Sequence, residues 1–224
     1  ISRGMEAFLS ALDITGSPHQ QRVITIATTP AMGALLMPGL ASALKPTFPQ
    51  ILLHNIAIVD AARQLDQRQV DLLIDTHLHS GQAISHHVLY QDRVQMYCRA
   101  GHPALDGPQD ETTLAEYEFA LLLPEGQRYP TLHRRLQEEM GERRCGFSTF
   151  NLMTQAAMIA GSDMLGLTTE RLFAMVSRLW PLQTLDFPSL GGEQIDVALH
   201  FNKLSGKEPL LKEIIETVIR SFKA

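Results

Sequence analysis

The chain has 224 residues, of which 45% are hydrophobic and 19% are charged, and its formal net charge is −5. This apolar fraction excludes an intrinsically disordered chain, and no apolar run reaches the roughly 18 residues that span a bilayer. The negative charge argues against nucleic-acid binding by this chain alone, because phosphate neutralisation needs a concentrated Lys/Arg face. We expect one large or two small domains of a soluble, cytoplasmic protein, although a secreted chain whose signal has been removed would look the same.

The first half of the chain alternates strand and helix signals. Alternating, β-branched residues predict a strand over Arg22 to Thr28. Leu36, Leu40 and Leu44 then recur at every fourth position, which predicts a helix that Pro38 either kinks or begins. A strand over 51–56, a helix through Ala61 and Leu65 and a strand over 70–74 follow. This β-α-β-α-β order is the pattern of a doubly wound parallel sheet.

The second half predicts another α/β unit. Two extended runs, HHVLY and RVQMYCR, are separated by Gln91 and Asp92, and turn residues over 101–108 indicate a domain boundary. The last helix shows Leu210, Ile214, Val218 and Phe222 in one stripe. Between them we expect strands over 119–123, 144–147, 164–167, 182–187 and 194–201, and helices over 130–140, 152–160 and 170–178. The fold class is therefore α/β, with two units in series.

Polar side chains stand where the predicted strands end. Ligands bind to open α/β sheets at the carboxyl ends of their strands, against helix N-termini. Thr28 and Thr29 can each cap the following helix or contact a ligand, and Asn55 allows the same two interpretations. The predicted effector-binding residues from both units are Thr28, Thr29, Pro30, Asn55, Ile56, Arg99, Pro124, Glu125, Ser148, Thr149 and Phe150. Together they predict a mostly apolar pocket with a few polar anchors.

Cysteines and histidines give weaker signals. Cys98 and Cys145 match no metal or redox spacing, which favours two reduced, mostly buried thiols. His77 and His79, at i and i+2 on extended chain, share a face and could ligate a metal with Asp75, or lie in a polar surface loop, and His86 and His87 begin the next predicted strand. No phosphate-binding loop, dinucleotide fingerprint or metalloprotease motif is present. We predict no cofactor.

Several motifs, in order, resemble the effector-binding domain of LysR-type transcriptional regulators. Residues RVITIATTPAMGALLMPGLASALKPTFPQ are similar to the family's strand, Ser/Thr-bearing turn and helix, and Gln69 to Ile74 (QVDLLI) to its "G-x-x-D-L-A-I" strand, although the Gly is replaced. LYQDRVQMYCRAGHPAL resembles the crossing strand, and AAMIAGSDMLGLTTERL a helix–strand motif in which Thr168 and Thr169 stand where Pro is common. These departures are closest to the NodD and LeuO branch.

This resemblance implies two Rossmann-like subdomains joined by two crossing strands, as in type 2 periplasmic binding proteins. It places the end of a linker helix at 1–21, subdomain I at 22–98 plus 203–224, and subdomain II at 99–202. It implies a small-molecule effector in the inter-lobe cleft, a homodimer or tetramer, and DNA contact only through a winged helix-turn-helix module absent from this chain. The start at Ile1 rather than Met is consistent with a piece of a longer protein. Met32, Leu36 and Leu40 are candidates for the pairing interface, or equally for the domain's own core.

Two other functions remain open at this stage. A solute-binding protein of a transporter shares the two-lobed fold. An enzyme on the same fold would need a nucleophile–base or carboxylate pair, and Glu125 with Arg128 offers little for catalysis. Arg93 and Arg99 could attract an anionic effector, or be solvated charges at strand edges.

Overall fold

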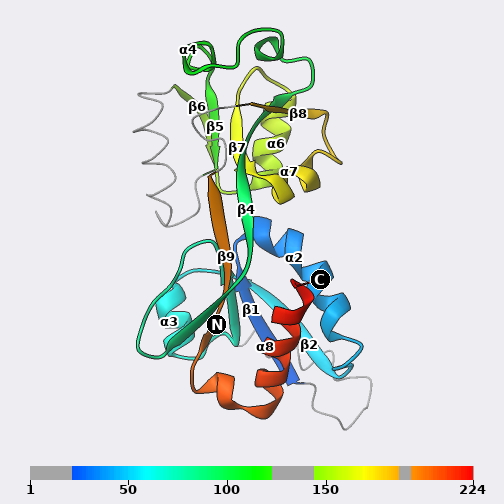
Figure 1. The fold of residues 1–224 in the computed structure, drawn as a ribbon, viewed down its shortest axis with the longest axis vertical. Helices are drawn as coiled ribbons and strands as arrows, with labels where there is room; N and C mark the ends of the chain where they lie inside the picture. Colours follow the sequence, from blue (N-terminus) through cyan, green and yellow to red (C-terminus); the bar gives the residue numbers. More distant parts are fainter. Residues whose placement is uncertain (1–21, 123–143, 187–192, 224) are drawn as a thin grey trace, which may run out of the picture.

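The computed structural model describes residues 22–122, 144–186 and 193–223. Two lobes lie end to end and are joined by two long strands, β4 (Ile84–Arg99) and β9 (Gln194–Asn202) (Figure 1). We call the part with the chain's first strands and last helix lobe I, and the other part lobe II. The expected helix over 130–140 lies outside the described residues. No helix in the described ranges is long and apolar enough to cross a membrane.

Lobe I is a sheet covered on both faces. β1 (Arg22–Thr28) pairs in parallel with β2 (Ile51–Ala57) and with β3 (Leu72–Asp75). Alternate residues of the strands enter separate apolar clusters, Ile24 and Ile26 in one and Ala27 in the other. The first cluster packs under α2 (Pro30–Leu44) and α8 (Pro209–Ser221), and the second under α3 (Ala61–Asp66). The two covered faces explain why these strands are apolar almost throughout.

The N-terminal caps of the helices follow from local sequence. Thr29 accepts a hydrogen bond from the Met32 amide at the start of α2, and Asp60 accepts one from the Arg63 amide at the start of α3. Pro38 lies inside α2, so the helix continues through it. In α8 the buried stripe uses Leu211 rather than the expected Leu210, which is 37% exposed. That shift by one residue turns the stripe without changing the helix.

Arg68 in lobe I adopts a backbone conformation that is unusual for a residue other than glycine. Arg68 stands where the family motif carries Gly, and its φ of +50° lies in the left-handed region that favours glycine. The turn from α3 to β3 therefore has, at Arg68, a backbone conformation that glycine would adopt without strain. The Gln69 and Val70 amides donate to the Gln64 carbonyl oxygen, which closes this turn.

β4 carries the sheet from one lobe to the other. Its residues 84–93 pair with β9, which also pairs with β3, whereas residues 94–97 pair with β7 (Gly166–Thr169) and 96–99 with β8 (Leu182–Leu185). The expected break into two extended runs at Gln91 and Asp92 is wrong, because both residues stay paired with β9. The irregularity falls earlier, as a shift of register between Val88 and Tyr90.

Lobe II is built around the second half of β4. β5 (Phe119–Leu122) pairs in parallel with β6 (Cys145–Thr149) and makes a bridge to Leu165 beside β7. Helices α6 (Leu152–Ala160) and α7 (Glu170–Val176) follow strands β6 and β7. Two short helical turns, η2 (Pro103–Leu105) and α4 (Glu111–Leu114), occupy and follow the expected turn region, and η3 (Ser205–Lys207) precedes α8.

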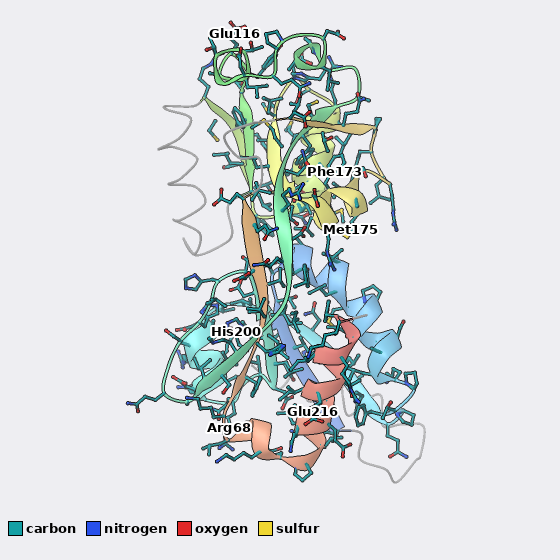
Figure 2. All side chains as sticks on the ribbon, viewed as in Figure 1. Arg68, Glu116, Phe173, Met175, His200 and Glu216 are labelled. Atoms are coloured by element: carbon teal, nitrogen blue, oxygen red, sulfur yellow. The ribbon has the colours of Figure 1, made fainter. Side chains whose placement is uncertain are left out.

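The cores of the two lobes are continuous on one side. α2 contacts both α6 and α7, and a single apolar cluster runs from β1 and α8 to α6 and α7. Figure 2 shows Phe173 and Met175 of α7 at the end of lobe II that faces α2. Met32, Leu36 and Leu40 are 4%, 5% and 1% exposed within this cluster, so of their two expected fates the structure shows burial in the core.

The thiols differ from one another. Cys98 is fully buried in lobe II, and its burial raises the pKa of the thiol to about 11. Cys145 is also free but exposed, so the expectation of burial is wrong for this residue. β6 has a paired neighbour, β5, on one side in the described residues, and this leaves its first residues open to solvent.

Candidate functional site

The strand ends of lobe I form a hydrogen-bonded wall. β1 and β2 run in register as far as Thr28 and Ala57, which places Asn55 across from Ile26. The Asn55 amide nitrogen donates to the Ile26 carbonyl oxygen at 2.9 Å and to Thr28 Oγ1 at 3.0 Å. Thr28 is 2% exposed, so its hydroxyl oxygen is held by Asn55 and is not itself at the surface. The amide oxygen of Asn55 is left for other partners.

The first turn of α2 approaches this wall closely. A Cβ placed on Gly33 would lie 2.7 Å from Asn55 Oδ1 and 2.8 Å from Thr28 Oγ1. No side chain fits there unless Asn55 or Thr28 moves. Glycine therefore brings the helix N-terminus, with its partial positive charge, against the two polar side chains.

Thr29 and Pro30 shape the start of that helix. The Thr29 hydroxyl caps α2 by accepting from the Met32 amide at 3.3 Å, and Pro30 takes the first helical position, where a missing N–H costs nothing. Thr29 is half-buried and Pro30 is exposed. The capping interpretation of Thr29 is confirmed, and its contact with a ligand stays a prediction. Ile56 is half-buried and packs against the α3 side of the sheet.

The strand ends of lobe II are more open. Ser148 is exposed near the end of β6, and Phe150 just after the strand is 52% exposed. Thr149 Oγ1 accepts a hydrogen bond from the Asn151 amide at 3.1 Å. Asn151 caps α6 by accepting from the Met153 amide at 2.8 Å. Lobe II thus offers a hydroxyl and an aromatic ring beside a capped helix N-terminus.

The other predicted residues are placed differently. The Arg99 guanidinium forms an ion pair with Asp163, with Nε at 2.8 Å and Nη2 at 2.7 Å from Oδ1. Its Nη1 donates to the carbonyl oxygens of Ala100 and Gly101. Arg99 therefore already has partners inside lobe II. Arg93 pairs with Glu170 at 3.6 Å, and Pro124 and Glu125 lie outside the described residues.

The histidines form a cluster at the end of β3. His79 Nε2 lies 2.8 Å from Asp75 Oδ2, and the His79 amide donates to Nε2 of His200 at 3.1 Å. The rings of His77 and His86 lie next to those of His79 and His200, respectively. Figure 2 shows His200 where β4 and β9 overlap in lobe I. Its burial lowers its pKa from 6.5 to about 4, which keeps the ring neutral and able to accept from His79.

Neither sequence interpretation of these histidines describes that arrangement in full. In the described part of the chain, no group of three or more His, Cys, Asp or Glu side chains is placed to hold a metal ion. His77 is exposed and His79 half-buried, as in a polar surface loop, but His79 contacts Asp75 of β3 and His200 of β9, which are 3% exposed and fully buried. Sequence reasoning missed His200, since a lone His in a strand gives no signal of its partners 121 residues away.

Two further residues escaped prediction. Thr168 and Thr169 end β7, and their hydroxyl oxygens are buried without a hydrogen-bond partner among the described residues. Such atoms are costly, so an unsatisfied pair at a strand end suits a place where a ligand or water completes the bonding. The signal was available, because the same two threonines interrupt the expected family motif.

The structure thus brings Thr28, Thr29, Pro30, Asn55 and Ile56 together in lobe I, and Ser148, Thr149 and Phe150 in lobe II. The two groups lie in different lobes, which the crossing strands join end to end (Figure 1). A two-lobed α/β domain with polar strand ends in both lobes defines the class of type 2 periplasmic-binding-protein folds.

The comparisons with known proteins identify the family. Residues 17–223 match the model of the LysR substrate binding domain, and the chain belongs to this family. An uncharacterised HTH-type transcriptional regulator of Escherichia coli K12, YbeF, is 44% identical over 222 residues, which cover 99% of this chain and 70% of the relative. The chain is therefore the effector-binding domain of a LysR-type transcriptional regulator, and a transporter's solute-binding protein is not favoured.

Solved structures support the fold. The reduced OxyR regulatory domain of Pseudomonas aeruginosa superposes with a TM-score of 0.72 at 17% identity, covering 92% of this chain and 99% of that one. The regulatory domain of CrgA, a LysR-type regulator of Neisseria meningitidis, gives a TM-score of 0.70 at 13% identity, with coverage of 91% and 100%. The likeness to the NodD and LeuO branch stays a prediction.

Proposed function

We propose that a small-molecule effector binds between the lobes, bridging Thr29 and Asn55 of lobe I and Ser148 and Thr149 of lobe II. The observation that carries this proposal is the approach of the α2 N-terminus to the Asn55–Thr28 pair through Gly33. The helix N-terminus is suited to an oxygen-rich group, whereas the Asn55 amide has donated to Ile26 and Thr28, so its oxygen would accept from a hydroxyl or N–H of the effector. Pro30, Ile56 and Phe150 would supply apolar contacts, and Pro124 and Glu125 complete the proposed set.

Arg99 has a different role in this proposal. Asp163 already neutralises its guanidinium, and the exposed edge of the pair faces solvent. An anionic effector would have to compete with Asp163 for it. We keep Arg99 in the proposed set as a residue that would have to exchange Asp163 for the effector.

The effector acts by favouring one lobe arrangement. Only a difference in affinity between two arrangements can shift their equilibrium. LysR-type regulators bind DNA through an N-terminal helix-turn-helix module and form oligomers. A change of lobe arrangement in paired domains would alter how their DNA-binding modules are presented, and this activity places the protein in the cytoplasm with the DNA.

The division into subdomains and the pairing face are part of the same proposal. We keep subdomain I at 22–98 plus 203–224 and subdomain II at 99–202, with 1–21 as the end of a linker. The change of partner of β4 from β9 to β7 near Val94 supports a boundary within the crossing strands. Since Met32, Leu36 and Leu40 are buried, a pairing face on α2 would use its exposed side, at Ala34, Pro38 and Ser42. Sedimentation that shows monomer alone at high concentration would contradict the pairing.

We further infer that the domain catalyses no reaction. Asp75 and His79 form an acid–base pair, and the group that the His79 amide contacts is the ring of His200. The alternative pair, Glu125 with Arg128, lies outside the described residues. Incubation with candidate metabolites followed by mass spectrometry should recover them unchanged.

A thermal-shift screen of small metabolites tests the site. A molecule at 100 times its dissociation constant should add about 2.7 kcal/mol to the stability of the domain. Thr29→Val and Ser148→Ala should each weaken the response to the hit, whereas Ser42→Ala, on the exposed side of α2, should leave it unchanged. Equal ligand titrations in all four proteins would reject the site assignment.

A further inference from the structure

The point where β4 leaves lobe I carries a group of contacts that the effector site does not use. β4 exchanges β9 for β7 between Arg93 and Val94, and the Val94 amide donates to the Glu193 carbonyl oxygen. Thr169 lies opposite Val94, and α7 begins at the next residue. The start of α7 in lobe II is therefore adjacent to the last residues of β4 that belong to lobe I.

Tyr90 connects elements of both lobes at this point. One face of its ring stacks on Phe222, at the end of α8 in lobe I, with centroids 5.5 Å apart and planes 20° apart. The Arg171 guanidinium of α7, in lobe II, lies over the ring with its Cζ 4.0 Å from the centroid. Tyr90 is 8% exposed whereas Arg171 is exposed, so the ring is shielded from water and the cation is not. Such a contact is weaker than one whose cation is also desolvated.

Asp92 fixes the same helix start from the strand. Its carboxylate is 5% exposed and accepts hydrogen bonds from the Arg93 amide at 3.0 Å and the Arg171 amide at 3.4 Å. Thr169, at the N-cap position of α7, makes no capping bond with its side chain. The Asp92 carboxylate of the crossing strand β4 thus caps α7 in place of the side chain of Thr169. The exposed ion pair between Arg93 and Glu170 adds a weaker contact at the same place.

We propose that Phe222, Tyr90, Arg171 and Asp92 form an inter-lobe clasp that holds the lobe arrangement seen in this structure. A rotation of lobe II about the crossing strands moves Arg171 relative to Tyr90 and Asp92, which remain with lobe I. The stacked cation and the Asp92 cap are then lost together. The clasp deepens the proposed function, because it supplies the resistance against which an effector would act, and it does not depend on which effector binds.

The clasp can be tested by measuring the separation of the lobes directly. Cys145 on β6 is exposed and Cys98 is buried, so a nitroxide label attaches to the natural Cys145 in lobe II. A second label attaches to a cysteine introduced by Glu216→Cys on the exposed face of α8 in lobe I. Pulsed electron–electron double resonance then gives the distribution of distances between the two nitroxides, one in each lobe. We expect one narrow distribution for the labelled protein, and a distribution at least twice as broad or shifted after Arg171→Gln.

Matched variants separate the clasp from general effects of charge. Arg171→Lys keeps the cation and should restore most of the narrow distribution, and Tyr90→Phe keeps the ring and should also preserve it, whereas Tyr90→Leu should broaden it. Arg178→Gln removes a charge from exposed chain just beyond α7 and should change nothing. Circular dichroism of each variant confirms that it is folded.

Identical distributions for Arg171→Gln, Tyr90→Leu and the parent, or equal broadening by Arg178→Gln, would overturn the proposal. Loss of the effector response in Thr29→Val with an unaltered clasp would instead concern the effector site alone.

Discussion

The strand ends of the two lobes differ in how their polar groups are satisfied. In lobe I, Thr28 is held by Asn55, and Asp75 by His79. In lobe II, Ser148 is exposed to solvent, and the hydroxyl oxygens of Thr168 and Thr169 are buried without partners in the described residues. Lobe I thus presents a wall whose geometry is already fixed by its own hydrogen bonds. Lobe II presents groups whose bonding can still change.

This difference suggests a division of labour in ligand binding. A fixed wall loses little freedom when a ligand binds to it, so it contributes affinity through preorganisation. A wall with unsatisfied or solvated groups gains bonds only when the ligand and the other lobe arrive. We expect lobe I to set where the effector docks and lobe II to report that it has docked.

The largest expected effect concerns His200, which is buried on β9 next to β3 in lobe I. Its pKa is lowered from 6.5 to about 4 in the folded domain, first by burial and then by the neighbouring His79. Between pH 4 and 6.5 the unfolded chain binds more protons at His200 than the folded domain does. The contribution of the neutral ring to the free energy of unfolding is therefore fully present above pH 6.5 and is lost as the pH falls towards 4. The shift corresponds to about 3 kcal/mol at most.

Urea unfolding of the parent and of His200→Gln between pH 7.5 and 4 measures this loss. The difference in the free energy of unfolding between the two proteins should shrink as the pH falls, because only the parent has an imidazole at position 200 to protonate. If the difference between the two proteins did not change with pH, the pKa of His200 in the folded domain would not be lowered.

The next effect concerns the approach of α2 to the wall. Gly33→Ala places a Cβ within 2.8 Å of both Asn55 Oδ1 and Thr28 Oγ1, and overpacking of this kind costs about 2 kcal/mol. Gly39→Ala, in the same helix, meets no atom within 4 Å and should stabilise the domain by up to about 1 kcal/mol through helix propensity. Denaturant unfolding should therefore give opposite signs for the two alanines. The same sign for both would mean that the wall can move aside.

Much of the fold was predictable from periodicity, because its elements are covered in regular patterns. The strand over Arg22 to Thr28 and the helix Leu152–Ala160 were predicted with the bounds observed, and the crossing strands and their place in a two-lobed fold followed from the motif order. The predicted break at Gln91 and Asp92 failed because polar residues end a strand only if their backbone loses its partners, and β9 supplies them here. That partner comes from a segment about 100 residues later.

The candidate site was predictable in part. Residues at the ends of strands can be named from sequence, since the chain must turn there, and the positions of Thr28, Thr29 and Asn55 near strand ends were predicted this way. What each does depends on its neighbours across the sheet, so the locking of Thr28 by Asn55 and the neutralisation of Arg99 by Asp163 could not be foreseen. Thr168 and Thr169 were visible as a departure from the motif, but only the structure shows that their hydroxyls are buried.

A smaller loss is expected when the amide of the wall is removed. Asn55→Ala leaves the buried Thr28 hydroxyl and the Ile26 carbonyl oxygen without their donor, which should cost about 1.5 kcal/mol. Thr28→Val removes the hydroxyl as well, so the double variant should cost less than the sum of the two single changes. Unfolding of all four proteins in urea gives this coupling. Strict additivity would show that the contact between Thr28 and Asn55 contributes nothing to holding the wall.

The smallest effect is expected in the opposite wall, at Ser148. This residue is exposed, and no hydrogen bond of its hydroxyl to the described residues is present. Ser148→Ala should therefore change the stability of the domain by less than about 0.5 kcal/mol, as surface substitutions away from special features usually do. Differential scanning calorimetry without added ligand provides the measurement, with Asn55→Ala as the reference for a loss that is readily detected. If Ser148→Ala cost as much as Asn55→Ala, the strand ends of lobe II would be as firmly bonded as those of lobe I, and the assignment of a docking lobe and a reporting lobe would fail.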